Sequence, residues 1–134
     1  MTPHEKRMVT QSWAQVEPIS EQAAELFYGR LFELDPDLKA LFKGDMQAQG
    51  RKLMASLALV VTSLDDLDGL VPVLQVMGRS HRGYGVKASD YDTVGAALLW
   101  TLGQGLGEAF TEDVKASWTE AYGLVATTMS EAAA

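Results

Sequence analysis

The chain has 134 residues, a formal net charge of −7 at pH 7, 47% hydrophobic residues and no cysteine. This length suits a single domain over residues 1–134, and the composition excludes the disordered and fibrous classes of protein. The lack of cysteine excludes disulfides, iron–sulfur clusters and thioether-attached cofactors in this chain, and the acidic balance argues against a nucleic-acid partner.

Apolar residues recur at helical spacing along almost the whole chain, which predicts an all-α protein. The first helix is expected to begin with a capping box formed by Thr2, Pro3 and Glu5, and to end at Pro18. Its inward residues are expected to be Val9, Trp13 and Val16. A second helix follows at once, with an inward face made of Ala24, Phe27, Tyr28, Leu31 and Phe32.

The middle of the chain begins with a short helical turn that Asp35 and Pro36 cap and that runs to Phe42. Residues 43–45 break the helical pattern. A long helix from about Met46 to Leu64 then carries an apolar stripe of Leu53, Leu57, Val60 and Leu64. The acidic run 65–69 is expected to close this helix.

The next helix is expected to be short and to stop at Gly83, with an inward face of Leu70, Leu74, Met77 and His81. Ser89 and Asp92 form a second capping-box pattern, which predicts the start of the following helix. That helix should bury Tyr91, Val94, Leu98, Leu102 and Leu106. Thr111 caps the last helix, whose inward residues are Val114, Trp118, Tyr122, Val125 and Met129.

Three polar residues occupy positions where these stripes call for apolar ones: His81, Gln49 and Tyr28. A polar group buried without a partner costs roughly 1–3 kcal/mol, so each needs an explanation. A single inward histidine is more often a satisfied core residue than a ligand. However, the only other histidine is His4, and the chain has no nucleophile elbow, phosphate-binding glycine loop or two-histidine metal spacing.

Four segments together resemble the globin family over essentially the whole chain. They are LFYGRLF at 26–32, DPDLKALF at 35–42, His81 followed ten residues later by Tyr91, and ASWTEAYG at 116–123. The chain is most similar in these segments to bacterial single-domain haemoglobins related to the globin half of flavohaemoglobins. The resemblance implies an all-α globin fold of six to eight helices around a buried haem, with a short or absent helix between Phe42 and Gln49.

The resemblance also implies that haem b is held without a covalent bond and that His81 is its axial iron ligand. The other ring nitrogen of His81 would donate to the Met77 carbonyl or to the Ser80 hydroxyl, which would fix the tautomer. Phe42 would pack on the haem plane. The full set of residues implied for the cofactor pocket is His81, Phe42, Gln49, Lys52, Leu53, Met77, Tyr91, Val94 and Leu98. We read Lys52 either as a partner of a haem propionate or as a solvated surface lysine.

On the distal side of the iron, the resemblance implies that Tyr28 and Gln49 donate hydrogen bonds to bound dioxygen and that Leu53 lies over the ligand. Gln47 is the rival of Gln49, but Arg51 lies four residues beyond Gln47 and would break the apolar stripe. We therefore prefer Gln49. Two donors in a dry pocket favour dioxygen, which carries partial negative charge on iron, over carbon monoxide.

The sequence departs from flavohaemoglobins in two respects. Tyr91 occupies the place of a tyrosine that those proteins combine with the axial histidine and a glutamate. Aligned from Trp118, that glutamate would fall just beyond Ala134, and Glu131 is out of register by about one helical turn. The flavin and nicotinamide domains are also absent from these 134 residues, so turnover would require an external reductase.

These observations lead to three expected functions. The first is binding, storage or scavenging of O2, with NO and CO as further ligands. The alternative is nitric oxide dioxygenation with an external reductase, and the third is a haem-free helical interaction module. No residue is assigned a catalytic role. We expect a cytoplasmic monomer or weak homodimer without a membrane partner, because no apolar run approaches the ~20 residues needed to cross a bilayer and the N-terminus lacks a secretory pattern.

Overall fold

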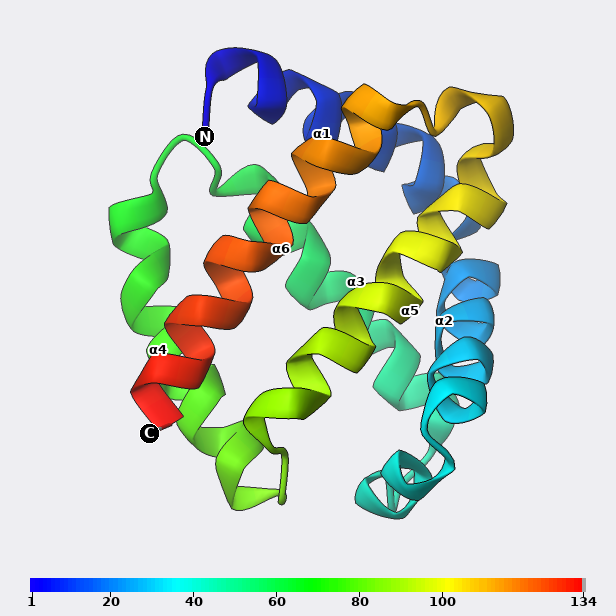
Figure 1. The fold of residues 1–134 in the computed structure, drawn as a ribbon, viewed down its shortest axis with the longest axis vertical. Helices are drawn as coiled ribbons and strands as arrows, with labels where there is room; N and C mark the ends of the chain where they lie inside the picture. The colour runs from blue at the N-terminus through cyan, green and yellow to red at the C-terminus, as the bar shows by residue number, and fades with distance from the viewer. Residues whose placement is uncertain (134) are drawn as a thin grey trace.

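The computed structural model describes residues 1–133, and all regular structure within them is helical (Figure 1). The all-α class is therefore confirmed. The α-helices are α1 Pro3–Val16, α2 Ser20–Leu34, α3 Met46–Thr62, α4 Leu67–Gly83, α5 Ala88–Leu106 and α6 Glu112–Ala133. Short 3-10 helices are η1 Glu17–Ile19, η2 Pro36–Leu41 and η3 Gly107–Ala109.

Helix α6, near the C-terminal end of the chain, packs against three other helices. It packs along α4, and it also contacts α1 and α5. Helix α2 packs mainly against α5 and crosses α3, so that α2, α3 and α5 form a second group (Figure 1). Helix α4 packs chiefly against α6, and its contacts with α3 and α5 are slight at most.

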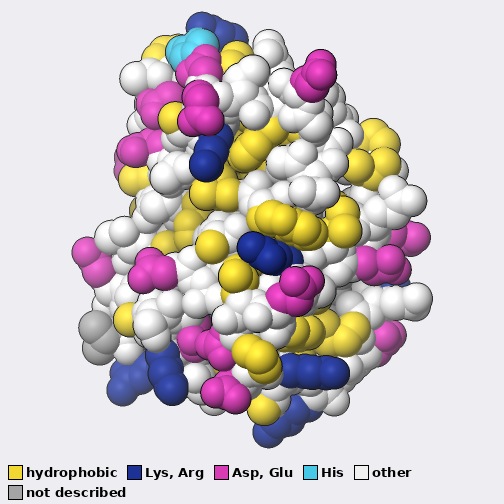
Figure 2. Space-filling view, turned by 45° about the vertical axis from the view of Figure 1, so that its right-hand side comes forward, with side chains coloured by type: hydrophobic (Ala, Val, Ile, Leu, Met, Phe, Trp, Pro, Cys, Tyr) yellow, Lys and Arg dark blue, Asp and Glu magenta, His cyan; other side chains and the backbone are white. Residues whose placement is uncertain are grey.

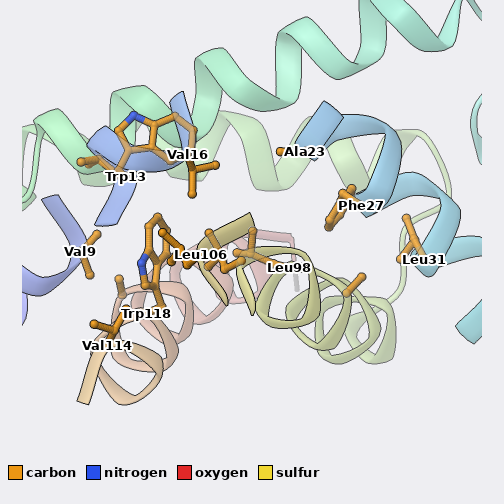
Figure 3. Close-up of a cluster of buried hydrophobic side chains, with 14 of the residues drawn as sticks. Val9, Trp13, Val16, Ala23, Phe27, Leu31, Leu98, Leu106, Val114 and Trp118 are labelled. Atoms are coloured by element: carbon orange, nitrogen blue, oxygen red, sulfur yellow. The ribbon is translucent and has the colours of Figure 1, made fainter. Parts of the chain in front are cut away.

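The main core lies between α1, α2, α5 and α6 (Figure 3). Trp13 and Trp118 join the first and last helices, with ring centroids 6.3 Å apart. The indole N–H of Trp118 donates to the hydroxyl of Ser12 at 2.7 Å, within the buried interior. Burial of these large rings adds apolar contact area between α1 and α6.

Three of the predicted helix starts are confirmed by hydrogen bonds. Thr2 and Glu5 form the full capping box of α1. The carboxylate of Asp35 accepts from the backbone N–H of Asp37 at the start of η2. The hydroxyl of Thr111 accepts from the N–H of Val114 at 3.2 Å at the start of α6. Short polar side chains fix these ends because the first N–H groups of a helix have no partner inside it.

The predicted start of the following helix, with Ser89 and Asp92 as a capping box, is wrong. Helix α5 begins at Ala88, and the buried carboxylate of Asp90 accepts from the N–H of Lys87 at 2.9 Å. Gly85 has a φ of 95°, a conformation that favours glycine, and it reverses the chain directly before this start. Ser89 therefore already lies inside the first turn.

The prediction that the helix bearing His81 is short is also wrong. Helix α4 has 17 residues and begins at Leu67, inside the acidic run that was expected only to close the preceding helix. Asp66 caps it by accepting from the N–H of Gly69 at 3.2 Å, and Asp68 lies in its first turn. Carboxylates are favourable at this end of a helix because of its dipole, so the run starts a helix.

The preceding helix ends slightly earlier than predicted. Helix α3 stops at Thr62, and the N–H of Ser63 bonds to the carbonyl of Val60. Leu64 is still buried, but from a turn. In the described part of the chain, none of the helices combines the length and the apolar character that crossing a bilayer requires.

Candidate functional site

His81 lies in the last turn of α4, half-buried, with its Nδ1 atom 2.7 Å from the carbonyl oxygen of Met77. Because a carbonyl can only accept, Nδ1 carries the proton and donates. The Met77 carbonyl is thus the partner that the structure shows, rather than the Ser80 hydroxyl. Within residues 1–133 no hydrogen bond or ion pair engages the Nε2 atom.

The position of His81 follows from the way α4 packs on α6. Leu70, Leu74 and Gly78 are the buried residues of α4. Gly78 makes the closest approach, because a Cβ atom there would overlap the backbone of Met129 on α6. His81 follows Gly78 by three residues, so it lies beside this packed face and just beyond it.

Tyr28 and Gln49 are brought together by the crossing of α2 and α3. The two helices meet at Ala24 and Gly50, where an added Cβ on Gly50 would lie 3.0 Å from the Ala24 Cβ. Tyr28 is one turn beyond Ala24, and Gln49 adjoins Gly50. Burial raises the pKa of Tyr28, and Gln49 opposes this rise as a side-chain hydrogen-bond partner.

The ring of Tyr28 is held by other aromatic rings. Phe27, Phe42 and Phe32 lie at centroid distances of 5.0, 5.3 and 6.1 Å from it. The contacts with Phe27 and Phe42 are edge-on, an arrangement that the charge distribution of aromatic rings favours. The hydroxyl group of Tyr28 is therefore carried on a ring with little freedom.

Gln47, the rival of Gln49, lies on the other side of α3. It is exposed and lines an open groove of about 620 Å³ between α2 and α3, together with Arg51 and Met54. Gln49 is half-buried and is not among the residues that line this groove. Tyr28 lines the same groove as Gln47, and Gln49 is the residue whose side chain acts to lower the pKa of Tyr28.

The apolar residues predicted for the cofactor pocket fall into two hydrophobic clusters. Phe42, Leu53, Val94 and Leu98 belong to or pack against the larger cluster, which extends to α1 and α6. Met77 and Tyr91 pack against a smaller cluster of Leu70, Leu74 and Met129. The half-buried side chains of Leu53 and Met77 thus stand on two helices, α3 and α4, that scarcely pack against each other.

Lys52 is exposed on α3, and neither a hydrogen bond nor an ion pair of its side chain occurs among the described residues. Tyr91 is half-buried, and its hydroxyl is a buried group without a hydrogen-bond partner in residues 1–133. Burial raises the pKa of Tyr91. Glu131 is exposed near the end of α6, and Ala134 lies outside the described residues.

Two residues that the sequence did not single out for the site contact the predicted ones. Tyr122 donates from its hydroxyl to the backbone carbonyl of Tyr91 at 2.6 Å, which fixes the start of α5 against α6. The ring of Tyr84 lies 6.2 Å from that of His81, between centroids, and is 68% exposed. The inward spacing of Tyr122 predicted its burial but not its partner, and nothing in the sequence pattern marked Tyr84.

Known proteins resemble this chain over most of its length. Residues 25–129 match the family model described as Globin. A flavohemoprotein of Chromobacterium violaceum is 39% identical over 107 residues, which cover 77% of this chain but only 26% of that protein. A neuroglobin of Tetraodon nigroviridis is 31% identical over 144 residues, covering 97% of this chain and 91% of the neuroglobin.

A solved structure has the same arrangement of helices. It is an engineered carbene transferase described as a putative nitric oxide dioxygenase from Rhodothermus marinus, with a TM-score of 0.89 and 26% identity. The match covers 99% of this chain and 93% of that one.

Proposed function

The chain belongs to the globin family, and from that membership we propose that it binds haem b through His81 and takes up dioxygen on the opposite face of the iron. Binding, storage or scavenging of oxygen is the function that this arrangement supports best. The observation that carries the proposal is the hydrogen bond from Nδ1 of His81 to the Met77 carbonyl.

That bond suits an axial ligand for a chemical reason. A neutral imidazole has one donor and one acceptor nitrogen, and a carbonyl partner at Nδ1 selects the tautomer in which Nε2 is the acceptor. A histidine that ligates iron is commonly oriented in this way by a second partner. The bond to Met77 therefore supports the ring orientation that coordination through Nε2 would require.

The residues around His81 also fit a flat, apolar group. Half-buried apolar side chains stand on both α3 and α4, although these helices scarcely pack against each other. Phe42, Leu53, Val94 and Leu98 would hold one side of the group, and Met77 and Tyr91 the other. Lys52, which is exposed at the edge of α3, would pair with a haem propionate.

A bound haem would supply an iron that takes up a diatomic gas, and His81 would hold that iron. The chain's own contribution toward the gas would be a pair of donors, the hydroxyl of Tyr28 and the amide of Gln49. Because burial raises the pKa of Tyr28, its hydroxyl keeps the proton and remains a donor at neutral pH. Such donors stabilise a ligand that accumulates negative charge, so they should slow the release of dioxygen.

The test of this proposal is the pair His81→Ala and His4→Ala. His4 is the only other histidine, and it is exposed at the start of α1, where it pairs with Asp113 at 2.6 Å. We expect His81→Ala to lose haem or to bind it loosely, with a changed visible spectrum, and His4→Ala to keep the spectrum of the unmodified protein. An unchanged histidine-ligated spectrum in His81→Ala would overturn the assignment, and failure of the unmodified protein to bind haem would favour a haem-free helical module.

Nitric oxide dioxygenation is the second candidate, favoured by the likeness to the structure described as a putative nitric oxide dioxygenase. Nitric oxide and dioxygen combine with one electron to give nitrate, so each turnover consumes one electron from a reductant. We expect the 134-residue chain saturated with dioxygen to form about one nitrate per haem with NADH alone, and to continue only when a separate reductase is added. Many turnovers with NADH alone would place this enzymatic function ahead of oxygen binding.

A further inference from the structure

The side of α4 that faces away from α6 is apolar at its centre. Val73, Val76 and Tyr84 are 41%, 57% and 68% exposed, among the most exposed large hydrophobic residues of the described chain. They stand at positions i, i+3 and i+11, which lie on one side of a helix. In Figure 1, α4 runs along one edge of the molecule, with α6 beside it.

Positive charges gather near the C-terminal end of α4 and in the turn that follows it. Residues 69–89 contain Arg79, Arg82 and Lys87 but no aspartate or glutamate, in a chain whose net charge is −7. All three are exposed, and none forms an ion pair within residues 1–133. Figure 2 shows Lys and Arg side chains gathered toward the lower end of the drawn face, where Figure 1 places both the turn after α4 and η2, and a group of acidic side chains at its upper end.

The fold itself does not use this surface. Helix α4 is held on α6 by its buried residues Leu70, Leu74 and Gly78, and Val76 and Arg79 lie on the opposite side of the helix. An apolar centre that contains a tyrosine, bordered by arginines and free of carboxylates, has the composition of a protein interface. We define the α4 outer face as Val73, Val76, Arg79, Arg82 and Tyr84.

The α4 outer face adjoins the functional site through one aromatic contact. The exposed ring of Tyr84 lies 6.2 Å from the ring of His81, between centroids, and Tyr84 N–H bonds to the carbonyls of Ser80 and His81. A partner seated on Tyr84 would therefore lie within one side chain of the residue that we propose as the iron ligand.

We propose that the α4 outer face docks an acidic electron-donor protein that carries a reduced flavin or iron–sulfur centre. This inference rests on the proposed haem function and adds the surface and the charge of the partner. The donor gives up one electron, which takes the iron from the ferric to the ferrous state, and no bond is made or broken in the protein. Apolar contact with Tyr84 and Val76 brings the donor to the surface beside His81, while Arg79 and Arg82 attract its carboxylates.

Charge selects this partner over a second copy of the chain. A symmetric dimer through the same face would bring two sets of Arg79 and Arg82 together, and like charges in contact are unfavourable. Three cations are also few for binding nucleic acid. A protein with an acidic face around its cofactor satisfies both the apolar centre and the unpaired cations.

The first experiment measures binding without any turnover. The probe is an oxidised, acidic flavodoxin, titrated into the ¹⁵N-labelled haem-loaded protein at low and at high salt. We expect the amide shifts that change to lie in residues 73–87, with binding at low salt that weakens as salt is added. Shifts confined to other helices would overturn the proposal.

The second experiment compares two variants with the same change in net charge. Arg79→Glu/Arg82→Glu reverses charge on the α4 outer face, and Arg7→Glu/Lys115→Glu reverses it at exposed positions of α1 and α6. With reduced flavodoxin at low salt, we expect the face variant to be reduced at least about tenfold more slowly than the unmodified protein, and the control to change by less than about threefold. Equal slowing of both variants would show that only net charge matters and would overturn the proposal.

Further readouts separate this inference from the haem proposal and from other occupants. The visible spectra of the face variant and of the control variant should match that of the unmodified protein, so loss of haem marks failure of the site and not of the docking surface.

Arg79→Gln/Arg82→Gln introduces no carboxylate near the carbonyl end of α4 and should slow reduction by an intermediate amount. Tyr84→Ala should weaken flavodoxin binding more than Tyr84→Phe. Binding to phosphatidylserine vesicles that only the face variant loses, with reduction rates unchanged, would overturn the proposal in favour of a membrane contact.

Discussion

At the scale of single residues, the polar side chains that lie in apolar stripes are the informative ones. His81 has a carbonyl partner at Nδ1 that offsets the cost of its partial burial. Tyr28 and Gln49 come from different helices, and Gln49 acts to lower the pKa of Tyr28 against the rise that burial causes. Their roles toward a gas ligand follow as proposals that single substitutions can test.

Replacing Tyr28 by Phe removes a donor and keeps the packing against Phe42. If the hydroxyl contributes roughly 1–3 kcal/mol to holding dioxygen, its release should become roughly 5- to 150-fold faster. Stopped-flow measurement of oxygen dissociation checks this, with carbon monoxide as the control ligand whose release should change much less. Gln49→Leu tests the second donor, and the two changes should be non-additive because both donors address one ligand. Identical oxygen release in Tyr28→Phe and the unmodified protein would remove Tyr28 from the distal side.

Buried tyrosines predict how stability depends on pH. Burial raises the pKa of Tyr122, whose hydroxyl donates to the carbonyl of Tyr91. A group with a raised pKa binds its proton more tightly when folded, so its contribution is complete below the unfolded value of about 10 and is lost as pH rises above it. Urea unfolding at about pH 8 and about pH 11 should show that Tyr122→Phe is less stable at the lower pH but loses less on going to the higher. A parallel loss in both proteins would contradict this prediction.

At the scale of secondary-structure elements, short polar side chains decided where helices begin, and the sequence offered more of them than the fold uses. Asp90 caps α5, although the spacing of Ser89 and Asp92 looked equally suitable. Asp66 starts α4, although the acidic run also looked like the end of the preceding helix. Local patterns therefore identified the helices but not all of their boundaries.

The crossing of α4 and α6 depends on the absence of a side chain at Gly78. A Cβ there would overlap the backbone of Met129, which cannot move like a flexible side chain, so Gly78→Ala should lower the free energy of unfolding by about 1–3 kcal/mol. Gly123→Ala is the matched control on α6, because no atom lies within 4 Å of its added Cβ. The control should gain about 0.5–1 kcal/mol, since alanine is the better helix former. Urea unfolding measures the free energy of unfolding of both variants. Equal effects would mean that the close approach of α4 and α6 does not require glycine at position 78.

At the scale of the whole molecule, α1 and α6 join the two ends of the chain. The hydroxyl of Ser12 accepts from Trp118 and donates to the carbonyl of Met8, so it satisfies buried groups on both helices. The rings of Trp13 and Trp118 lie near one another in the same buried cluster (Figure 3). This contact is one that the order of residues along the chain does not reveal, because its partners are 106 positions apart.

Ser12→Ala should destabilise the whole fold because it leaves the buried indole N–H of Trp118 without an acceptor. The expected loss in the free energy of unfolding is about 1–3 kcal/mol. Thr10→Ala is the control: its hydroxyl also donates to the carbonyl four residues earlier, at 2.7 Å, but it is exposed. The control should change stability by less than about 0.5 kcal/mol. If thermal or urea unfolding shows equal losses, the bond to Trp118 is not what stabilises the pairing of α1 and α6.

The sequence by itself determined the helical class, most of the inward faces and the three polar residues on them, because the 3.6-residue period of a helix and the cost of burying a polar group are both local properties of the chain. The preference for Gln49 over Gln47 stays a prediction from the spacing of the apolar stripe. Only the tertiary structure decided which groups meet: that α2 and α3 cross at Ala24 and Gly50, near Tyr28 and Gln49, that Tyr122 bonds to Tyr91, and that Tyr84 lies beside His81. These contacts depend on how closely two helices approach, and this distance is set by residues such as Gly50 and Gly78 together with their partners on another helix.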